Sequence, residues 1–341
     1  MRVGMAGLAA LYWPVAIGGG LKAKADAGVE FVAAATMGQD GGYIRDCLGM
    51  TADEYAAKFG VKMYDCAEEM IAREKLDTVV LNGKHSEHAN LAEKIAKCKV
   101  DIYLPKTFAT TAADARRIAD AEKTYGVKIA SGPSARYMPE MLTLKKAMDD
   151  GVIGKVFSMR ICHHHGVIDV FHPNDWYWLP EEGGPELSLG WYGIDLMMSL
   201  FGEDVKKVYA NYANFTTPKS PFMDCGRMTM VMESGALGNF DMYFCNRVDF
   251  PSWQAEIVGT DGVLSLQRVN GNSRKLTIVA DTKGGCKSIP VLENVPAWEM
   301  IWADDYLAGR AHACGAEYAS RVTELSVAAW ESAKKGVIID V

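Results

Sequence analysis

Short apolar runs alternate with amphipathic segments through the first third of the chain. Runs that fit buried strands lie at residues 2–7, 30–36, 76–83, 100–105 and 127–132. The segments between them have apolar residues at helical spacing, and two of them close on glycine, as helices commonly do. Because strands that alternate with helices form parallel sheets, we expect residues 1–132 to form an α/β, Rossmann-like domain with a doubly wound parallel sheet.

A different pattern begins after about residue 133. Helices are predicted at 139–154, 189–202 and 321–336, and the remainder is rich in strands. Two glycine-containing turns, ESGALG and GTDGVL, fit hairpins of a mostly antiparallel sheet. We therefore expect residues 133–341 to form a separate α+β domain with a large antiparallel sheet.

Charge and composition exclude several classes of partner. Lys and Arg number 36 against 43 Asp and Glu, so the net charge of −7 argues against a nucleic-acid-binding face. The eight cysteines show no CxxC pair and no zinc-ligand spacing, which indicates reduced thiols and no metal site. No apolar run is long enough to cross a bilayer, and the chain opens on a strand rather than a signal peptide. These features predict a cytoplasmic protein without membrane partners.

The turn after the first predicted strand is a candidate phosphate loop. A dinucleotide fold favours GxGxxG here, so that backbone can approach a pyrophosphate at a helix N-terminus. Gly7 keeps the first glycine, whereas Ala9 and Tyr12 stand at the other two positions. The backbone of Gly7, Leu8, Ala9 and Ala10 is the predicted cofactor contact, although an ordinary strand–turn–helix would look similar.

The end of the second predicted strand leaves the choice of cofactor open. A carboxylate that binds the ribose 2′-hydroxyl is expected there, but the chain has Thr36 and Met37. The missing carboxylate removes its repulsion against a 2′-phosphate, while the nearest following arginine is Arg45. Either NAD or NADP is therefore the expected cofactor.

Five segments in a fixed order together resemble the Gfo/Idh/MocA (glucose–fructose oxidoreductase / inositol dehydrogenase) family over nearly the whole chain. They are VGMAGL, LDTVVLNGKHSEHANLA, IYLPKTFATT, RYMPEMLTLKKAMDDGVIGKV and WYWLPEEGGPELSLGWYGIDLMMSLFG. The resemblance implies an NAD(P)-dependent oxidoreductase acting on a secondary hydroxyl of a sugar, polyol or glycoside. It also implies that the cofactor lies on the first domain and that the open sheet face of the second packs in a dimer or tetramer.

Only some of the family's site residues are present in this chain. Lys106 matches the family lysine that lies by the nicotinamide and the reacting carbon–oxygen bond, and Asp195 matches the family aspartate. Ser188 replaces the first aspartate of that second pattern, and Tyr192 replaces the usual catalytic histidine.

Further cofactor contacts follow from the same resemblance. His88 matches the histidine at a helix start, whereas Gly83 and His85 belong to a stretch that replaces Thr-Pro-Asn. Together with Asn82 and Pro105, which replaces the motif glutamate, these residues are expected to border the cofactor.

The chemistry of alcohol oxidation can be argued from the residues themselves. A group must take the hydroxyl proton as the hydride leaves, and a positive charge must lie near the oxygen. Lys106 can supply the charge, and the resemblance implies that Asp195 orients or relays. Tyr192, one helical turn from Asp195, could be the acid/base because a neighbouring ammonium lowers a phenol pKa. It could equally be a substrate-binding hydroxyl, with a histidine as the base.

A histidine run offers candidates for that base. His163 and His165 share a strand face, His164 points the other way, and His172 follows in the sequence. They could be polar strand-end residues, substrate or acid/base residues, or, least expected, metal ligands together with Asp169 or Asp175.

Aromatic residues gather in the same part of the sequence. Sugar rings stack on aromatic rings, so Trp176, Trp191 and Tyr192 are predicted substrate contacts, with core or interface packing as the alternative. Two other functions remain open: a lyase or glycosidase that uses tightly bound NAD for transient oxidation, and a non-catalytic nucleotide sensor.

Overall fold

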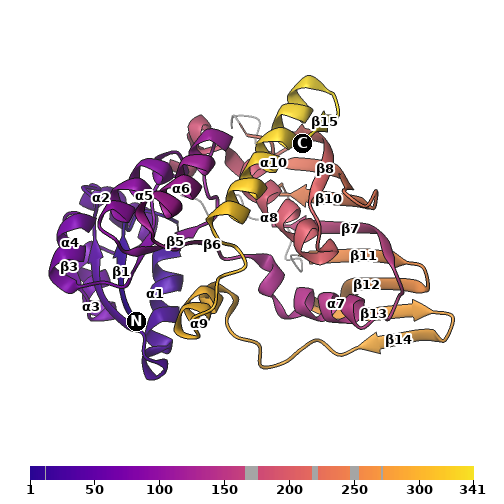
Figure 1. Ribbon diagram of the computed structural model, residues 1–341, viewed down its shortest axis with the longest axis horizontal. Coiled ribbons are helices and arrows are strands. Elements are labelled where there is room, and N and C mark those ends of the chain that lie inside the picture. Colours follow the sequence, from indigo (N-terminus) through magenta and orange to yellow (C-terminus); the bar gives the residue numbers. More distant parts are fainter. Residues whose placement is uncertain (12, 166–175, 217–221, 246–252, 270–271) are drawn as a thin grey trace. The chain divides into compact units, whose positions relative to one another are not determined.

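The computed structural model describes residues 1–11, 13–165, 176–216, 222–245, 253–269 and 272–341 (Figure 1). The chain divides into two compact units. The first comprises the described residues of 1–134, 171–182 and 296–324, and the second comprises those of 135–170, 183–295 and 325–341. The expected division after residue 132 lies close to the first change of unit, but two later segments return to the first unit.

The first unit contains a six-stranded sheet with the order β3-β2-β1-β4-β5-β6, in which every pairing is parallel. Its strands are β1 (Arg2–Ala6), β2 (Glu30–Ala35), β3 (Lys62–Tyr64), β4 (Thr78–Leu81), β5 (Asp101–Pro105) and β6 (Ile129–Gly132). The strand order reverses between β1 and β4, and ligands of such sheets bind beyond the carboxyl ends of the strands at this switch point. The predicted Rossmann-like sheet is confirmed, and β3 is an additional edge strand.

The first unit also contains helices. They are α1 (Trp13–Ala23), α2 (Gly41–Leu48), α3 (Ala52–Phe59), α4 (Ala67–Glu74), α5 (His88–Lys97), α6 (Ala112–Tyr125) and α9 (Ile301–Leu307), with short 3₁₀ turns at Ala25–Ala27, His85–Glu87, Trp176–Trp178, Pro180–Glu182 and Trp298–Met300. The Tyr103 ring of β5 stacks on Trp302 of α9, with ring centroids 4.5 Å apart. Met300 and Trp302 thereby complete the first unit's core, although they are about two hundred residues from Tyr103 in the sequence.

The second unit contains a nine-stranded sheet with the order β14-β13-β12-β11-β7-β10-β9-β8-β15. Its strands are β7 (Val156–His164), β8 (Val205–Ala213), β9 (Cys225–Met232), β10 (Leu237–Tyr243), β11 (Trp253–Gly259), β12 (Gly262–Val269), β13 (Asn272–Thr282), β14 (Gly285–Ile289) and β15 (Ile339–Asp340). Only the central β7–β10 pairing is parallel among the described pairings, so the predicted mostly antiparallel sheet is confirmed.

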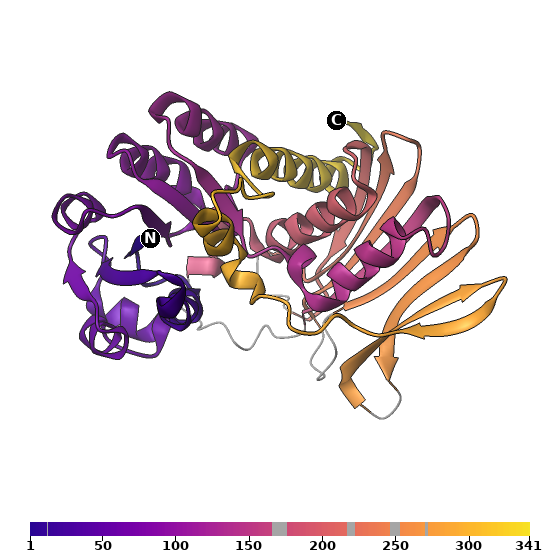
Figure 2. The ribbon, with the colours of Figure 1, turned by 60° about the horizontal axis from the view of Figure 1, so that its bottom comes forward.

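One face of this sheet carries helices α7 (Pro139–Asp149) and α8 (Gly184–Phe201) (Figure 2). Gly193 allows α8 to approach β10 closely, because a Cβ there would lie 2.3 Å from the Phe240 ring. The helix α10 (Ala316–Lys335) begins in the first unit and continues into the second.

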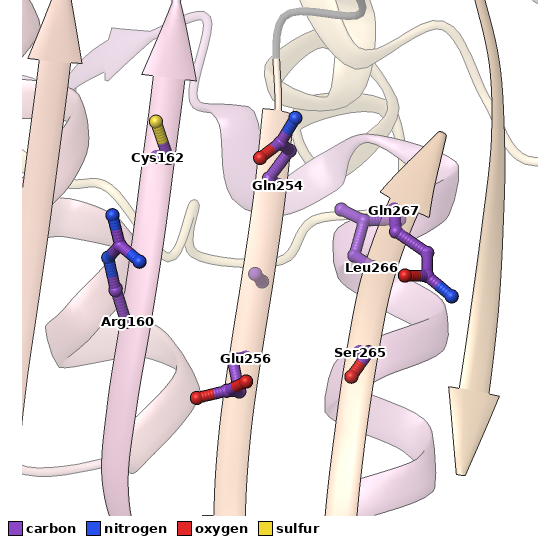
Figure 3. Close-up of a pocket in the computed structure, with 8 residues that line it drawn as sticks. Arg160, Cys162, Gln254, Glu256, Ser265, Leu266 and Gln267 are labelled. Carbon is purple, nitrogen blue, oxygen red and sulfur yellow. The ribbon is translucent and has the colours of Figure 1, made fainter. Parts of the chain in front are cut away.

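The opposite face of the sheet is polar. Figure 3 shows Arg160, Gln254, Glu256 and Gln267 standing on adjacent strands of this face, around a shallow hollow of about 200 Å³. On the same face, Asp241 is fully buried because Arg160 and Arg227 both donate to its carboxylate. No helix among the described residues is both long enough and apolar enough to cross a membrane.

Candidate cofactor and substrate sites

The turn after β1 requires glycine. Gly7 has φ of +90°, and a Cβ atom on it would lie 1.8 Å from the carbonyl oxygen of Asn82 at the end of β4. The Gly7 amide donates to Ala35 O at the end of β2, at 2.9 Å. Three strand ends therefore meet at this turn, and no side chain can be placed there without moving the backbone.

The two amides that follow Gly7 converge on one acceptor. Leu8 N and Ala9 N donate to Gln39 Oε1 at 2.8 and 3.0 Å. Successive backbone N–H groups that point at one oxygen form the kind of concavity that binds anions. Ala10 N donates back to Leu8 O at 3.0 Å and closes the loop, whereas Tyr12 lies outside the described residues.

The end of β2 turns sharply beside this loop. Thr36 N donates to Tyr64 O at 2.9 Å, which adds β3 to the edge of the strand. Met37 and Gly38 follow with φ of +58° and +72°. The two left-handed residues reverse the chain direction ahead of Gln39, a residue for which the sequence offered no signal.

Most of the predicted cofactor residues surround one small cavity of about 10 Å³, the size of a single water molecule. Its lining contains Ala10, Asn82, Gly83, His85, His88, Pro105 and Lys106, together with Leu11, Trp13 and Trp176. The residues come from the loop after β1 and from the carboxyl ends of β4 and β5, which is the edge where Rossmann-like sheets bind ligands.

Two buried histidines in this lining are held neutral. His85 Nδ1 donates to Glu182 O at 3.3 Å, and His85 Nε2 accepts from Thr107 N at 3.4 Å. Burial, with His88 and Lys106 nearby, lowers the pKa of His85 well below its usual value. Burial also lowers the pKa of His88 to about 4, against the effect of its hydrogen bond with Phe108 O. Neither imidazole therefore carries charge near neutral pH.

Lys106 is 9% exposed, and burial lowers the pKa of its ammonium to about 7. The lysine can consequently be charged or neutral near physiological pH. A strongly shifted pKa in such a position is typical of functional sites. Sequence analysis expected Lys106 to supply a positive charge, and the burial that lowers its pKa could not be deduced from PKTF alone.

Trp176, in the 3₁₀ turn Trp176–Trp178 of the first unit, contacts the loop after β1. Its indole Nε1 donates to Ala9 O at 2.8 Å, its backbone N donates to Tyr43 Oη at 3.1 Å, and its ring meets His85 edge-on at 4.8 Å. Glu182, which follows Trp176 in the chain, adds another contact within the first unit, because its carboxylate accepts hydrogen bonds from Ser86 N and Oγ. Trp176 was expected among substrate contacts, and the structure gives it contacts with the predicted cofactor loop.

The second unit brings other predicted residues together. The His163 ring stacks on Trp253 at 3.8 Å, and it meets Tyr192 at 6.0 Å and His165 at 5.5 Å with nearly perpendicular planes. His164 occupies the opposite face of β7, where its Nε2 lies 3.2 Å from Cys162 Sγ. This is the alternation predicted for the histidine run. His172, Asp169 and Asp175 lie outside the described residues.

Two further predicted residues of α8 are deeply buried. Asp195 is fully buried and accepts hydrogen bonds from Nε and Nη2 of Arg136, which lies in the 3₁₀ turn Ala135–Tyr137. Trp191, a predicted substrate contact, is also 0% exposed. Within the described residues, no group of three or more His, Cys, Asp or Glu side chains is arranged to hold a metal ion.

Comparison with known families matches both parts of the chain. Residues 43–132 match the family model described as oxidoreductase family, NAD-binding Rossmann fold. Residues 141–265 match the model of the GFO/IDH/MocA C-terminal domain.

Curated relatives and solved structures are similar to the chain as well. A D-apiose dehydrogenase from Paraburkholderia graminis is 29% identical over 212 residues, which cover 61% of this chain and 56% of the relative. A myo-inositol 2-dehydrogenase from Thermotoga maritima is 26% identical over 192 residues, 55% of this chain and 56% of the relative. These matches thus span little more than half the length of either relative.

Solved structures share the fold over the full length. An aldose–aldose oxidoreductase from Caulobacter crescentus, complexed with glycerol, has a TM-score of 0.82 at 18% identity and covers 100% of this chain and 99% of its own. An oxidoreductase from Agrobacterium radiobacter, in complex with NAD⁺, L-tartaric acid and magnesium, has a TM-score of 0.81 at 19% identity, with 100% and 98% covered.

Proposed function

Because the chain belongs to the Gfo/Idh/MocA family, we propose that it is an NAD(P)-dependent oxidoreductase acting on a secondary hydroxyl of a sugar, polyol or glycoside. The observation that carries the proposal is the buried Lys106 at the carboxyl edge of a Rossmann-like sheet, with its pKa near 7. The names of the relatives, which include dehydrogenases of D-apiose and of myo-inositol, support the substrate class.

The residues of the first unit fit a dinucleotide. The Leu8 and Ala9 amides converge as donors to one oxygen, which suits a phosphate oxygen, and the buried Asn82 Oδ1 has no hydrogen-bond partner within the described residues. We assign cofactor binding to this loop, to Asn82 and to the residues around Lys106. NAD or NADP bound there would supply the hydride acceptor or donor.

Lys106 can contribute to the reaction in either of its protonation states. As an ammonium it stabilises negative charge that develops on the substrate oxygen, and as a neutral amine it accepts the hydroxyl proton at Nζ. A pKa near 7 gives both forms comparable populations at neutral pH. The neutral His85 and His88 beside it add no competing positive charge.

In the second unit we assign substrate binding and a second proton-carrying role to the cluster of His163, His165 and Tyr192. His163 is 4% exposed and Tyr192 5%, so both are held rigidly among aromatic rings. Asp195 holds Arg136 and thereby fixes the start of the second unit against α8. Assembly into a dimer or tetramer through the polar sheet face, which carries Arg160 and Arg227, belongs to the same proposal.

The test begins with calorimetric titration of NAD and NADP and continues with a panel of sugars, polyols and glycosides followed at the nicotinamide absorbance. The proposal expects at least one cofactor to bind and substrate-dependent net reduction. Substrate turnover without net reduction of added cofactor would instead indicate transient oxidation. Failure of both cofactors to bind would overturn the proposal.

A further inference from the structure

Gln39 occupies the hydrogen-bond donors of the loop to which we assigned the cofactor. Its side-chain Oε1 accepts from Leu8 N at 2.8 Å and from Ala9 N at 3.0 Å. The inference drawn from this contact rests on the proposed cofactor binding and specifies one residue that controls it.

The backbone around Gln39 is constrained while its side chain can move. Gln39 N donates to Thr36 O at 3.1 Å, and the following Asp40 caps α2 by accepting from Tyr43 N at 3.0 Å. The Gln39 side chain itself is only partly buried. It can therefore leave the loop by rotating, without disturbing the turn after β2 or the start of α2.

The contact has a clear energetic role in the free protein. Leu8 and Ala9 are both 0% exposed, and a buried amide without an acceptor is costly. Gln39 provides that acceptor. A phosphate oxygen in the same position would make charge-assisted hydrogen bonds, which are roughly twice as strong as those to a neutral amide oxygen.

We propose that Gln39 is an internal competitor for the phosphate-binding amides and that its displacement sets the affinity for the dinucleotide. Binding then exchanges two neutral hydrogen bonds for two charge-assisted ones, and the apparent affinity is reduced by the fraction of molecules in which Gln39 is in place. The cofactor's anionic oxygen, not its base or ribose, is the group that competes.

Two substitutions of opposite expected effect test this role. In Gln39→Ala the competitor is absent, so NAD⁺ or NADP⁺ should bind about three- to tenfold more tightly. In Gln39→Glu a carboxylate of the same shape accepts from both amides more strongly, so binding should weaken about tenfold or more. Asn90, an exposed residue of α5 in the first unit, receives the corresponding Ala and Asp substitutions as the control.

Thermal unfolding of the same proteins without cofactor provides a readout independent of binding. Gln39→Ala should melt below the wild type because its two buried amides lose their acceptor, whereas Gln39→Glu should melt at or above it. The rise in melting temperature that saturating cofactor produces should be largest in Gln39→Ala and smallest in Gln39→Glu.

The outcomes separate the competing explanations. Repulsion between a new carboxylate and the cofactor would weaken binding in Gln39→Glu but leave Gln39→Ala like the wild type, and this result would overturn the inference. So would weaker binding in Gln39→Ala, because Gln39 would then be a direct cofactor contact. Absence of binding in every protein, the wild type included, would overturn the proposed function as well.

Discussion

The guanidinium of Arg136 donates through both Nε and Nη2 to the carboxylate of Asp195 in the interior of the second unit. The Asp195 side chain is 0% exposed and that of Arg136 only 12%. The two residues are 59 positions apart, so the pair ties the turn before α7 to the middle of α8. The family resemblance singled out Asp195 as a carboxylate that orients or relays, and in the structure this carboxylate binds the guanidinium of Arg136.

Asp195→Asn is expected to destabilise the protein by about 3–5 kcal/mol, because it removes the negative partner of a buried ion pair. Urea denaturation measures the loss. Asp150→Asn is the control, since Asp150 pairs with Lys146 on the surface, with side chains 54% and 60% exposed, and should cost less than about 1 kcal/mol. The double variant Arg136→Met/Asp195→Asn should lose less than the sum of its single variants. Strict additivity would contradict the pairing.

Alanine substitutions at Gly7 and Gly28 distinguish the cost of a left-handed backbone conformation from the cost of a steric clash. Both have φ of +90°, but a Cβ on Gly7 would lie 1.8 Å from Asn82 O, whereas nothing lies within 4 Å of one on Gly28. Gly28→Ala should cost about 1–2 kcal/mol for the left-handed conformation alone. Gly7→Ala should cost clearly more and should abolish cofactor binding, since strands β1 and β4 must separate. Equal losses of unfolding free energy in the two variants, measured by urea denaturation, would show that the turn after β1 can relax to accommodate the Cβ.

Local pattern was sufficient to predict the architecture of both sheets. Apolar runs, helical spacing and terminal glycines are properties of neighbouring residues, so they revealed five of the six parallel strands and the antiparallel character of the second sheet. The short β3 has only three residues and no apolar run of its own, since it forms an edge and only partly buries its side chains.

The contacts of the candidate sites were less predictable because they join distant segments. Trp302 returns to stack on Tyr103, Arg136 reaches Asp195, and Gln39 caps the loop after β1. None of these pairs has a sequence signal, because each depends on where the chain passes in three dimensions. The lowered pKa of Lys106 has the same origin, since burial is a property of the folded surroundings.

Lys106 should make folding stability depend on pH. Its folded pKa is about 7, below the value of about 10.4 for an unfolded chain, so the unfolded state binds more protons between these pH values. The contribution to stability therefore rises with pH across this range, by up to about 1.4 kcal/mol per unit. Lys106→Met removes this pH-dependent contribution. The difference in free energy of unfolding between the variant and the wild type should therefore favour the variant most near pH 7, and it should shrink toward pH 10.

Urea denaturation at several pH values measures this difference in stability. Lys58→Met, at an exposed lysine, is the control substitution. A stability difference for Lys106→Met that stays constant from pH 7 to pH 10 would contradict the lowered pKa, whatever its absolute size.

His163 and His164 offer a matched pair for the proton-carrying role. They are adjacent on β7, but His163 contacts Trp253 and Tyr192 on the helix-covered face, whereas His164 stacks on Tyr243 on the polar face. If His163 transfers the hydroxyl proton, His163→Gln should lower kcat about 100-fold or more while leaving the Kd of the cofactor unchanged. His164→Gln should retain near-normal turnover. A fall in kcat for Tyr192→Phe, with normal turnover in His163→Gln, would assign the proton to the tyrosine instead, because the phenol is also titratable and belongs to the same cluster.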